Sequence, residues 1–224
     1  MPALTQSGFR PIAVDTPGFG SSPYDGHGWS VHRMAAEMAI LLEDLRCGAA
    51  HVVGLSMGGT IAQQFALDHP HLTRKLVLVS TFAVLRPGSL KGWLYFLQRF
   101  FVVNMLGLPV QARLVAQRIF PRPDQAQLRD IFLQTISQAD PRAYRKAMLS
   151  LGLFNSIKRL GEITAPTLVV TGEEDTTVPP SRQRALVEGI PAARQVFIAN
   201  GGHAVPVDQA ERFNAELLAF LSKS

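Results

Sequence analysis

Residues 51–70 of the chain read HVVGLSMGGTIAQQFALDHP. The first five are mostly apolar and partly β-branched, which predicts a short buried strand. After Ser56, apolar residues recur at helical spacing as far as Pro70, which predicts a helix that ends before this proline. The segment Gly54-x-Ser56-x-Gly58 is therefore expected to form a tight turn between a strand and a helix.

A serine in such a turn has the setting of a catalytic nucleophile. A strained strand-to-helix turn lifts the Ser56 hydroxyl beyond the sheet, and Gly54 and Gly58 have no Cβ atoms to obstruct the passing chain. The start of the helix points backbone N–H groups toward a reacting carbonyl, so we expect the Met57 N–H to be an oxyanion donor. The alternative is an ordinary serine in a glycine-rich turn, because five residues can match by chance.

Length and composition limit the class of protein. The chain has 224 residues, of which 47% are hydrophobic and 17% charged, which suits one α/β domain with an inserted subdomain. No apolar run reaches the roughly 18 residues of a membrane span, and the N-terminus does not resemble a secretory signal. The single Cys47 excludes an internal disulfide, and we interpret it as structural. We therefore expect a cytoplasmic protein without a membrane partner.

The order of expected elements predicts an α/β fold with a doubly wound, mostly parallel sheet, because strand-like runs alternate with helical patterns. Strands are expected at residues 9–15, 51–55, 75–80, 167–172 and 195–199. Residues 82–163 lack such runs and instead carry amphipathic patterns at 89–106, 109–119, 124–138 and 141–153. We expect residues 1–81 and 164–224 to form the core and residues 82–163 to form a helical lid.

The expected lid differs from the remainder in charge. It holds twelve basic and four acidic residues, a net charge of +8, while the remainder carries −3. One interpretation is a solvated helical surface, and the other is attraction of anionic substrates. No nucleic-acid-binding motif accompanies the charge, so we expect no nucleic-acid partner. The inner face of the lid is expected to contact substrate through Trp93, Phe96 and Phe100, although core packing would use the same apolar stripe.

A serine nucleophile needs a base and an orienting acid, and two expected strand ends carry them. Asp175 follows the strand at 167–172, and His203 follows the strand at 195–199. The carboxyl ends of parallel strands meet at one edge of a sheet, so Ser56, Asp175 and His203 are expected to meet there. Glu173 or Glu174 could replace Asp175 as the acid. No spacing of histidine and cysteine indicates a metal site.

Four motifs together resemble those of the α/β-hydrolase superfamily, over nearly the whole chain. They are the loop 14–22 (VDTPGFGSS), the turn 54–59 (GLSMGG), the acid strand 165–179 (APTLVVTGEEDTTVP) and the base loop 202–204 (GHA). The turn is similar to the version found in enol-lactone hydrolases and other small-ester hydrolases. The chain order of nucleophile, acid and base is also that of this superfamily.

The resemblance implies a cofactor-free serine hydrolase that cleaves a small carboxylic ester, thioester or lactone through an acyl-enzyme. It implies a small-molecule substrate and no metal, and it makes no prediction about oligomeric state. Hydrolysis of a carbon–carbon bond with the same three residues is the alternative reaction. An epoxide hydrolase or haloalkane dehalogenase would require aspartate at position 56, where this chain has serine.

The sequence departs from the superfamily before residue 9. Members usually carry further strands there, and the last of these leads into a His-Gly loop that supplies a second oxyanion N–H. His27-Gly28 does not follow an expected strand, so only Met57 is expected to donate. The strands at 9–15 and 51–55 should then pair directly, or an apolar sheet edge should be exposed. A non-catalytic module with a hydrolase-like fold is the alternative function.

Overall fold

The protein is represented by a computed structural model that describes residues 1–85, 90–191 and 193–222. The chain forms two compact units, which we describe separately. The sheet unit consists of Met1–Val14, Met34–Ala83 and Ser156–Ser224, and the helical unit consists of Asp15–Arg33 and Val84–Asn155. These limits differ from the expected segments, because Leu160 and Ile163 are buried in the core of the sheet unit. The expected role of the helices as a lid remains a prediction.

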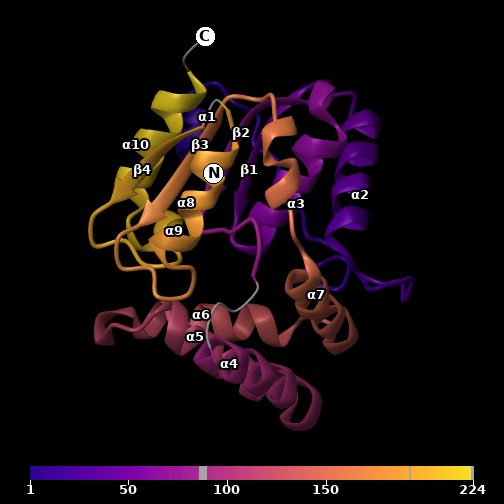
Figure 1. Cartoon of the computed structure of the whole chain (residues 1–224), viewed down its shortest axis with the longest axis vertical. Helices are drawn as coiled ribbons and strands as arrows, with labels where there is room; N and C mark the ends of the chain where they lie inside the picture. Colours follow the sequence, from indigo (N-terminus) through magenta and orange to yellow (C-terminus); the bar gives the residue numbers. More distant parts are fainter. Residues whose placement is uncertain (86–89, 192, 223–224) are drawn as a thin grey trace. The chain divides into compact units, whose positions relative to one another are not determined.

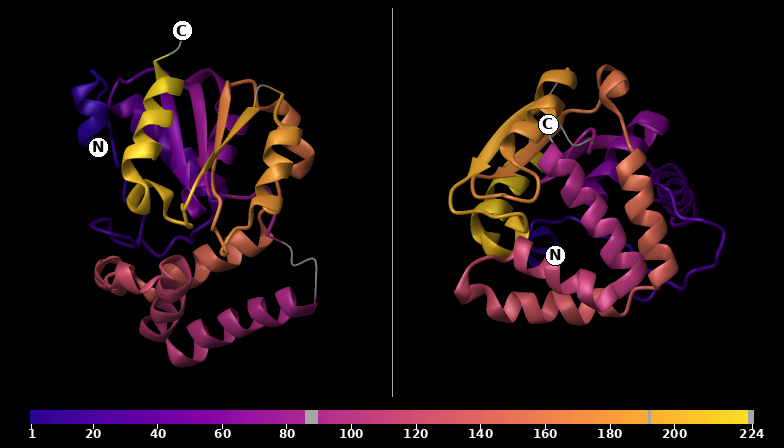
Figure 2. Two further views of the ribbon diagram at one scale, coloured as in Figure 1. Left: turned by 90° about the vertical axis from the view of Figure 1, so that its left-hand side faces the viewer. Right: turned by 60° about the horizontal axis from the view of Figure 1, so that its bottom comes forward.

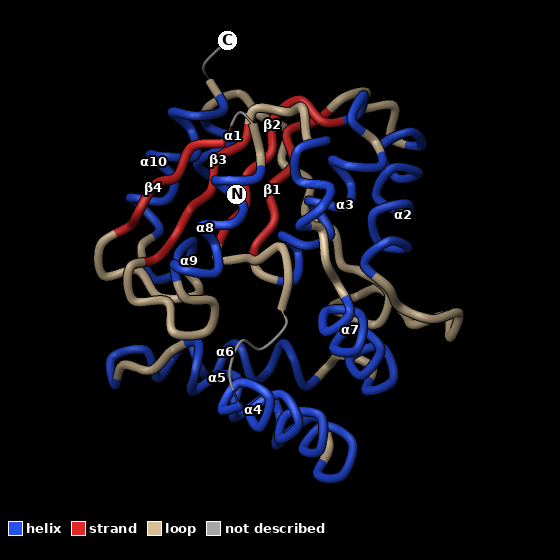
Figure 3. The backbone as a smooth tube through the Cα atoms, viewed as in Figure 1, coloured by secondary structure: helices blue, strands red, loops and turns tan. Residues whose placement is uncertain are grey.

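The sheet of the described chain has four parallel strands that lie side by side in chain order (Figures 1 and 3). They are β1 (Ala50–Leu55), β2 (Thr73–Val79), β3 (Thr167–Gly172) and β4 (Ala193–Ile198). Each matches an expected strand to within two residues at either end. Every residue of β3 is buried, which explains why its sequence is apolar without alternation.

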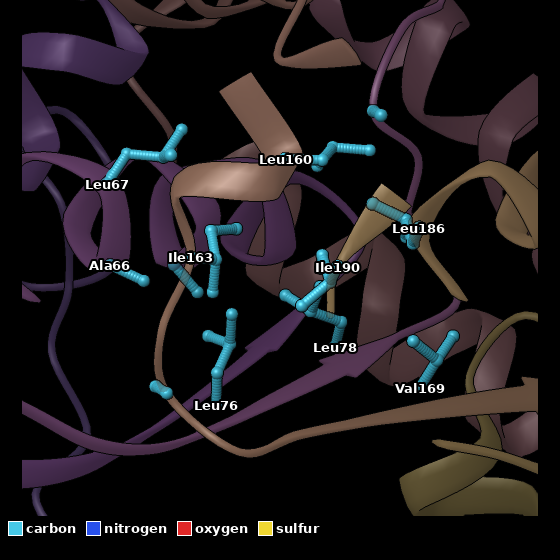
Figure 4. Packing of buried hydrophobic residues seen from close by; sticks show 12 residues of the cluster. Ala66, Leu67, Leu76, Leu78, Leu160, Ile163, Val169, Leu186 and Ile190 are labelled. Atoms are coloured by element: carbon cyan, nitrogen blue, oxygen red, sulfur yellow. The ribbon is translucent and has the colours of Figure 1, made fainter. Parts of the chain in front are cut away.

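Helices cover both faces of this sheet, as expected for a doubly wound fold. Leu76 and Leu78 of β2 pack on one face in a cluster with α3 (Met57–Asp68) and α8 (Pro180–Gly189), which Figure 4 shows. Val77 and Val79 point to the other face, where they pack with α10 (Ala210–Leu221). Figure 2, left, shows α10 along this second face. Successive strand residues therefore bury opposite sides of the sheet.

The described chain has further helices outside the segment between β2 and β3. Gln209, whose φ of −134° is not helical, separates α9 from α10. The further elements are α1 (Pro2–Gln6), α2 (Val31–Asp44), η1 (Pro70–Leu72), η4 (Ile157–Glu162) and α9 (Val205–Asp208).

The strand expected at residues 9–15 is wrong, because this segment joins no ladder in the described sheet. Strands need a neighbouring backbone, and Pro11 lacks an N–H to donate. The exposed apolar edge, the second of the two outcomes expected, is what the structure has. Val53 and Leu55 of β1 are 45% and 37% exposed, and Ile12 is 41% exposed.

The helical unit confirms the helical prediction for the chain between β2 and β3. Its elements are α4 (Leu90–Phe101), η2 (Val102–Leu106), α5 (Leu108–Ile119), η3 (Pro123–Gln125), α6 (Ala126–Ser137) and α7 (Pro141–Leu153). Val103, Leu108 and Tyr144 form its small core, and Phe19 packs against them. The loop after residue 14 therefore belongs to this unit. None of the helices that the structure describes is long and apolar enough to cross a membrane.

Candidate active site

Ser56 occupies a strained turn between β1 and α3. Its φ of 51° and ψ of −111° lie in a region that residues with a side chain rarely adopt. Four hydrogen bonds hold it there. The Ser56 N–H donates to the Val79 carbonyl at 2.9 Å, and the Ser56 carbonyl accepts from the Thr81 hydroxyl at 2.7 Å and from the N–H groups of Gly59 and Thr60. The neighbouring strand β2 and the first turn of α3 therefore impose the strain.

One glycine of the Gly-x-Ser-x-Gly motif is required by packing, and the other is not. A Cβ atom on Gly54 would collide with the backbone of Gly58 and Gly59, so the strand passes the helix at close range. At Gly58, however, a Cβ atom would meet no atom within 4 Å. The expectation that both glycines serve this approach is therefore correct for Gly54 and wrong for Gly58.

His203 connects Ser56 with Asp175 through both nitrogens of its ring. The Ser56 Oγ lies 2.9 Å from His203 Nε2, and Asp175 Oδ2 lies 2.9 Å from His203 Nδ1. The side chains of His203 and Asp175 are 5% and 0% exposed, so solvent does not compete for the contact between them. The contacts expected among these three side chains are present. Their spacing suits transfer of the serine proton to the imidazole.

The Asp175 carboxylate is fixed by its own loop. Asp175 Oδ1 accepts hydrogen bonds from the N–H groups of Thr177 and Val178, both at 2.8 Å. The other oxygen, Oδ2, is left for His203. Glu173 and Glu174, considered as alternative acids, are exposed, and it is Asp175 that contacts the imidazole.

A buried polar network, which no sequence motif indicates, holds the Asp175 loop. Gln183 of α8 is fully buried and donates through Nε2 to the Val178 carbonyl at 2.9 Å. The Thr171 hydroxyl of β3 donates to Gln183 Oε1 and accepts from Gln195 of β4, each at 2.8 Å. Neither glutamine belongs to a motif. The network links the acid loop to both neighbouring strands.

The His203 loop is positioned by close backbone packing against β3. A Cβ atom on Gly172 would collide with the backbone of Gly201 and Gly202. Asp208 accepts a hydrogen bond from the Gly202 N–H at 2.9 Å, one residue before the imidazole. Asp208 was not expected from sequence, because a single aspartate near a helix start is common.

Met57 is the first residue of α3, so its N–H has no acceptor within the helix. The partial positive charge of the helix start lies beside the Ser56 hydroxyl. This placement agrees with the position expected for an oxyanion donor, and the role itself remains a prediction. Of the expected substrate contacts, Phe100 of α4 is 47% exposed, whereas the side chains of Trp93 and Phe96 lie outside the part that the structure describes.

Side chains that could ligate a metal ion do not form a cluster in the described chain. No group of three or more histidine, cysteine, aspartate or glutamate side chains there could hold a metal ion. The rings of His69 and His71 lie edge to face beyond the end of α3, with their centroids 6.5 Å apart, and His51 packs edge-on against Phe9.

Comparison with known proteins identifies the family of this chain. A family model for the alpha/beta hydrolase fold matches residues 1–210. The RutD protein of Variovorax paradoxus (strain S110), a provisionally named carbamate hydrolase, is 32% identical over 229 residues, which cover 99% of this chain and 84% of that protein. A poly(3-hydroxyalkanoate) depolymerase from Ectopseudomonas oleovorans is 33% identical over 218 residues, with 95% of this chain and 75% of the depolymerase covered.

A solved structure gives the same result in three dimensions. The crystal structure of a hydrolase from Pseudomonas aeruginosa PA01 superimposes with a TM-score of 0.88 at 26% identity, covering 99% of this chain and 83% of that one. The family model describes the alpha/beta hydrolase fold, and the two relatives and the solved structure carry names of enzymes that cleave bonds by hydrolysis or depolymerisation. The chain belongs to the α/β-hydrolase fold family, and its relatives support hydrolase activity.

Proposed function

We propose that this protein is a serine hydrolase that cleaves a small carboxylic ester, thioester or lactone through an acyl-enzyme. The observation that carries the proposal is the chain of contacts from Ser56 through His203 to Asp175, with 2.9 Å at each step. A hydroxyl, an imidazole and a buried carboxylate in this order are the parts needed for acyl transfer.

In the first half of the reaction, Ser56 Oγ attacks the acyl carbon while His203 Nε2 takes the hydroxyl proton. Asp175 keeps the Nδ1 proton in place and stabilises the imidazolium that forms. The tetrahedral intermediate then collapses, the bond to the leaving group breaks, and the imidazolium gives its proton to the departing oxygen or sulfur. The acyl group is left on Ser56.

In the second half, a water molecule attacks the acyl carbon while His203 removes a proton from this water. The acid product leaves, and the proton returns to Ser56 Oγ. The Met57 N–H stabilises the oxyanion in both halves, and one such donor is worth about 10²- to 10³-fold in rate. The strained backbone at Ser56 keeps the hydroxyl beside this N–H throughout.

The relatives support the class of bond. A carbamate and a poly(3-hydroxyalkanoate) both present a carbonyl carbon attached to a heteroatom leaving group, as an ester does. Such a carbon suits a serine nucleophile because the leaving heteroatom can accept the proton held by His203. No bound metal is needed for these steps.

The test is turnover of matched substrates by the purified full chain. p-Nitrophenyl acetate and butyrate, a thioester, a γ-lactone and a vinylogous diketone would be compared with the corresponding simple amide. We expect hydrolysis of oxygen or sulfur esters or lactones, with loss in Ser56→Ala. Turnover of the diketone alone would move the reaction to carbon–carbon bonds. Unchanged ester turnover in Ser56→Ala would overturn the proposal.

A further inference from the structure

The helical unit contains a cavity of about 440 Å³, a size within the range of small-molecule sites. One wall is α7 and the facing wall is the end of α4 with η2, which lie side by side in Figure 2, right. Its lining consists of Tyr24, Gly26, Phe100, Asn104, Arg142, Arg145, Lys146 and Leu149. All of these residues belong to the helical unit.

Three cations from one face of α7 line this cavity, and only one of them is neutralised. Arg142 pairs with Asp140 at 3.0 Å and lies over the Tyr24 ring at 5.6 Å. The pair lowers the pKa of Asp140 to about 2, so its carboxylate stays charged beside Arg142. In the described part of the chain, Arg145 and Lys146 have no ion-pair partner. The cavity therefore carries uncompensated positive charge.

Other charges near the cavity are already paired. Asp25, next to Gly26 in the chain, forms an ion pair with Arg33, which keeps the pKa of Asp25 near 2. Asp140 also accepts from the N–H groups of Arg142 and Ala143 and so caps α7. Neither carboxylate is left to neutralise Arg145 or Lys146.

Two large apolar side chains of the wall are solvent-exposed. Phe100 and Leu149 are 47% and 46% exposed, although large apolar side chains are usually covered. Phe100 lies one helical turn before Asn104, whose amide donates to the Phe100 carbonyl at 2.7 Å. Cations beside exposed apolar side chains form a surface with a charged end and an apolar end.

We propose that this cavity binds a small organic anion, a carboxylate on an apolar body. The carboxylate would accept hydrogen bonds from Arg145 and Lys146, which are adjacent on α7. The apolar body would cover Phe100 and Leu149. An inorganic anion would satisfy the cations and leave the two apolar side chains exposed, so the combination favours an organic ligand.

This proposal concerns binding alone, and it stands whether or not Ser56 is a nucleophile. It assigns a use to two of the twelve basic residues that the sequence places between 82 and 163.

The experiment is calorimetric or fluorescence titration of the full chain with 3-phenylpropionate, which cannot be hydrolysed, and with neutral 3-phenylpropionamide at equal ionic strength. We expect saturable binding of the carboxylate and binding of the amide that is about tenfold weaker, because the charged hydrogen bonds are lost. Arg145→Gln/Lys146→Gln should weaken carboxylate binding to the level of the amide. Arg113→Gln/Lys158→Gln removes the same charge from exposed positions and should change little.

A second pair of variants tests the apolar wall. Phe100→Ala should weaken binding of both probes. Phe101→Ala should not, because the neighbouring Phe101 is also exposed but lies outside the cavity lining. Circular dichroism of each variant checks that it is folded. The proposal is overturned by absence of saturable 3-phenylpropionate binding at millimolar concentration, by equal binding of the amide, or by equal loss in both charge-matched double variants. Sulfate that displaces the carboxylate equally well in the wild type and in Phe100→Ala would indicate adventitious binding of an anion only.

Discussion

Polar side chains are used differently in the sheet unit and the helical unit. In the sheet unit, the buried polar side chains of the candidate site are paired: His203 with Ser56 and Asp175, and Gln183 with Thr171. In the helical unit, Arg145 and Lys146 line a cavity beside exposed apolar side chains. Pairing in the sheet unit fixes the polar side chains in one geometry before a ligand binds. The two cations of the helical unit remain available to bind a ligand.

This difference predicts two kinds of mutational effect, one on the rate constant and one on ligand affinity. Pairing within the sheet unit holds Ser56, His203 and Asp175 at reactive distances, so mutations there should lower the rate constant. In the helical unit, Arg145 and Lys146 form no ion pair in the described chain, so mutations of these two residues should act on ligand affinity. The comparison fails if the two classes of mutation have the same kinetic effect.

The largest effect is expected at the nucleophile and the base. Ser56→Ala and His203→Ala should each lower kcat for an ester by roughly 10⁴- to 10⁶-fold, because neither proton transfer nor acyl-enzyme formation remains. Ester hydrolysis measured at substrate saturation gives the rate, and thermal unfolding shows whether the fold is kept. Residual activity near the wild-type level in either variant would contradict the assignment.

Asp175→Asn should cost almost as much, about 10⁴-fold in kcat, because the amide favours the wrong imidazole tautomer. Glu174→Gln and Glu173→Gln are the matched controls, since each removes one carboxylate from the same loop at an exposed position. Steady-state kinetics of the three variants decides between the acids. A larger loss in either control than in Asp175→Asn would move the role to that glutamate.

A smaller effect is expected from the network behind the acid. Gln183→Met keeps the side-chain size but removes the donor to the Val178 carbonyl and the acceptor of the Thr171 hydroxyl, which should destabilise the fold by about 1–3 kcal/mol. Because Val178 also donates to Asp175, kcat should fall about tenfold while KM stays nearly constant. Denaturant unfolding and kinetics measure the two effects. Gln117→Met, at an exposed position of α5, is the control. A change in KM alone would exclude the positioning role.

The charge of the helical unit should change kcat/KM only a few-fold. If its cations attract an anionic ester, kcat/KM should fall with added salt, because exposed charges are screened within about 10 Å at 0.1 M. A neutral ester of the same size should respond little. Steady-state kinetics at several salt concentrations gives the salt dependence of kcat/KM for the two esters. Equal salt dependence would show that the charge does not attract the anionic substrate.

The smallest effect concerns a buried polar group of the sheet unit that is not paired. His51 Nδ1 is buried without a hydrogen-bond partner in the described chain, and burial, with Lys75 and Arg74 nearby, lowers the pKa of His51. A histidine pKa that is lower in the folded state favours folding above the ordinary value of about 6.5, and this stability is lost as pH falls through the folded pKa.

His51→Gln should therefore flatten the dependence of the unfolding midpoint on pH below about 6.5, relative to wild type. Thermal unfolding at several pH values between weakly acidic and neutral conditions measures this. His71→Gln, at an exposed position, is the control. If both variants keep the wild-type slope, His51 does not contribute.

The sequence predicted all four strands of the described sheet and failed at residues 9–15, which pair with none of these strands. β3 could be recognised because burial on both faces makes its whole run apolar. Residues 9–15 have a similar apolar pattern, yet no strand of the described sheet pairs with them. An apolar pattern in the sequence indicates that a segment is buried. Formation of a strand also requires a neighbouring backbone with which the segment can pair.

At the site, the motif located Ser56, His203 and Asp175, since their residue types and order are characteristic. Thr81 and Gln183 could not be predicted, because a threonine after a strand and a glutamine in a helix are common. Their roles come from contacts between residues far apart in the chain. The cavity on α7 likewise depends on the packing of α4 and η2, although the net positive charge of the segment was visible in the sequence.

Covalent labelling of Ser56 tests the central claim most directly. The full chain would be treated with a fluorophosphonate, and intact mass and peptide mapping would locate the adduct. We predict one adduct, on Ser56, with no labelling in Ser56→Ala and labelling slowed by orders of magnitude in His203→Ala, whose serine lacks its base. Absence of labelling in the wild type, or an adduct on another residue that persists in Ser56→Ala, would contradict the account.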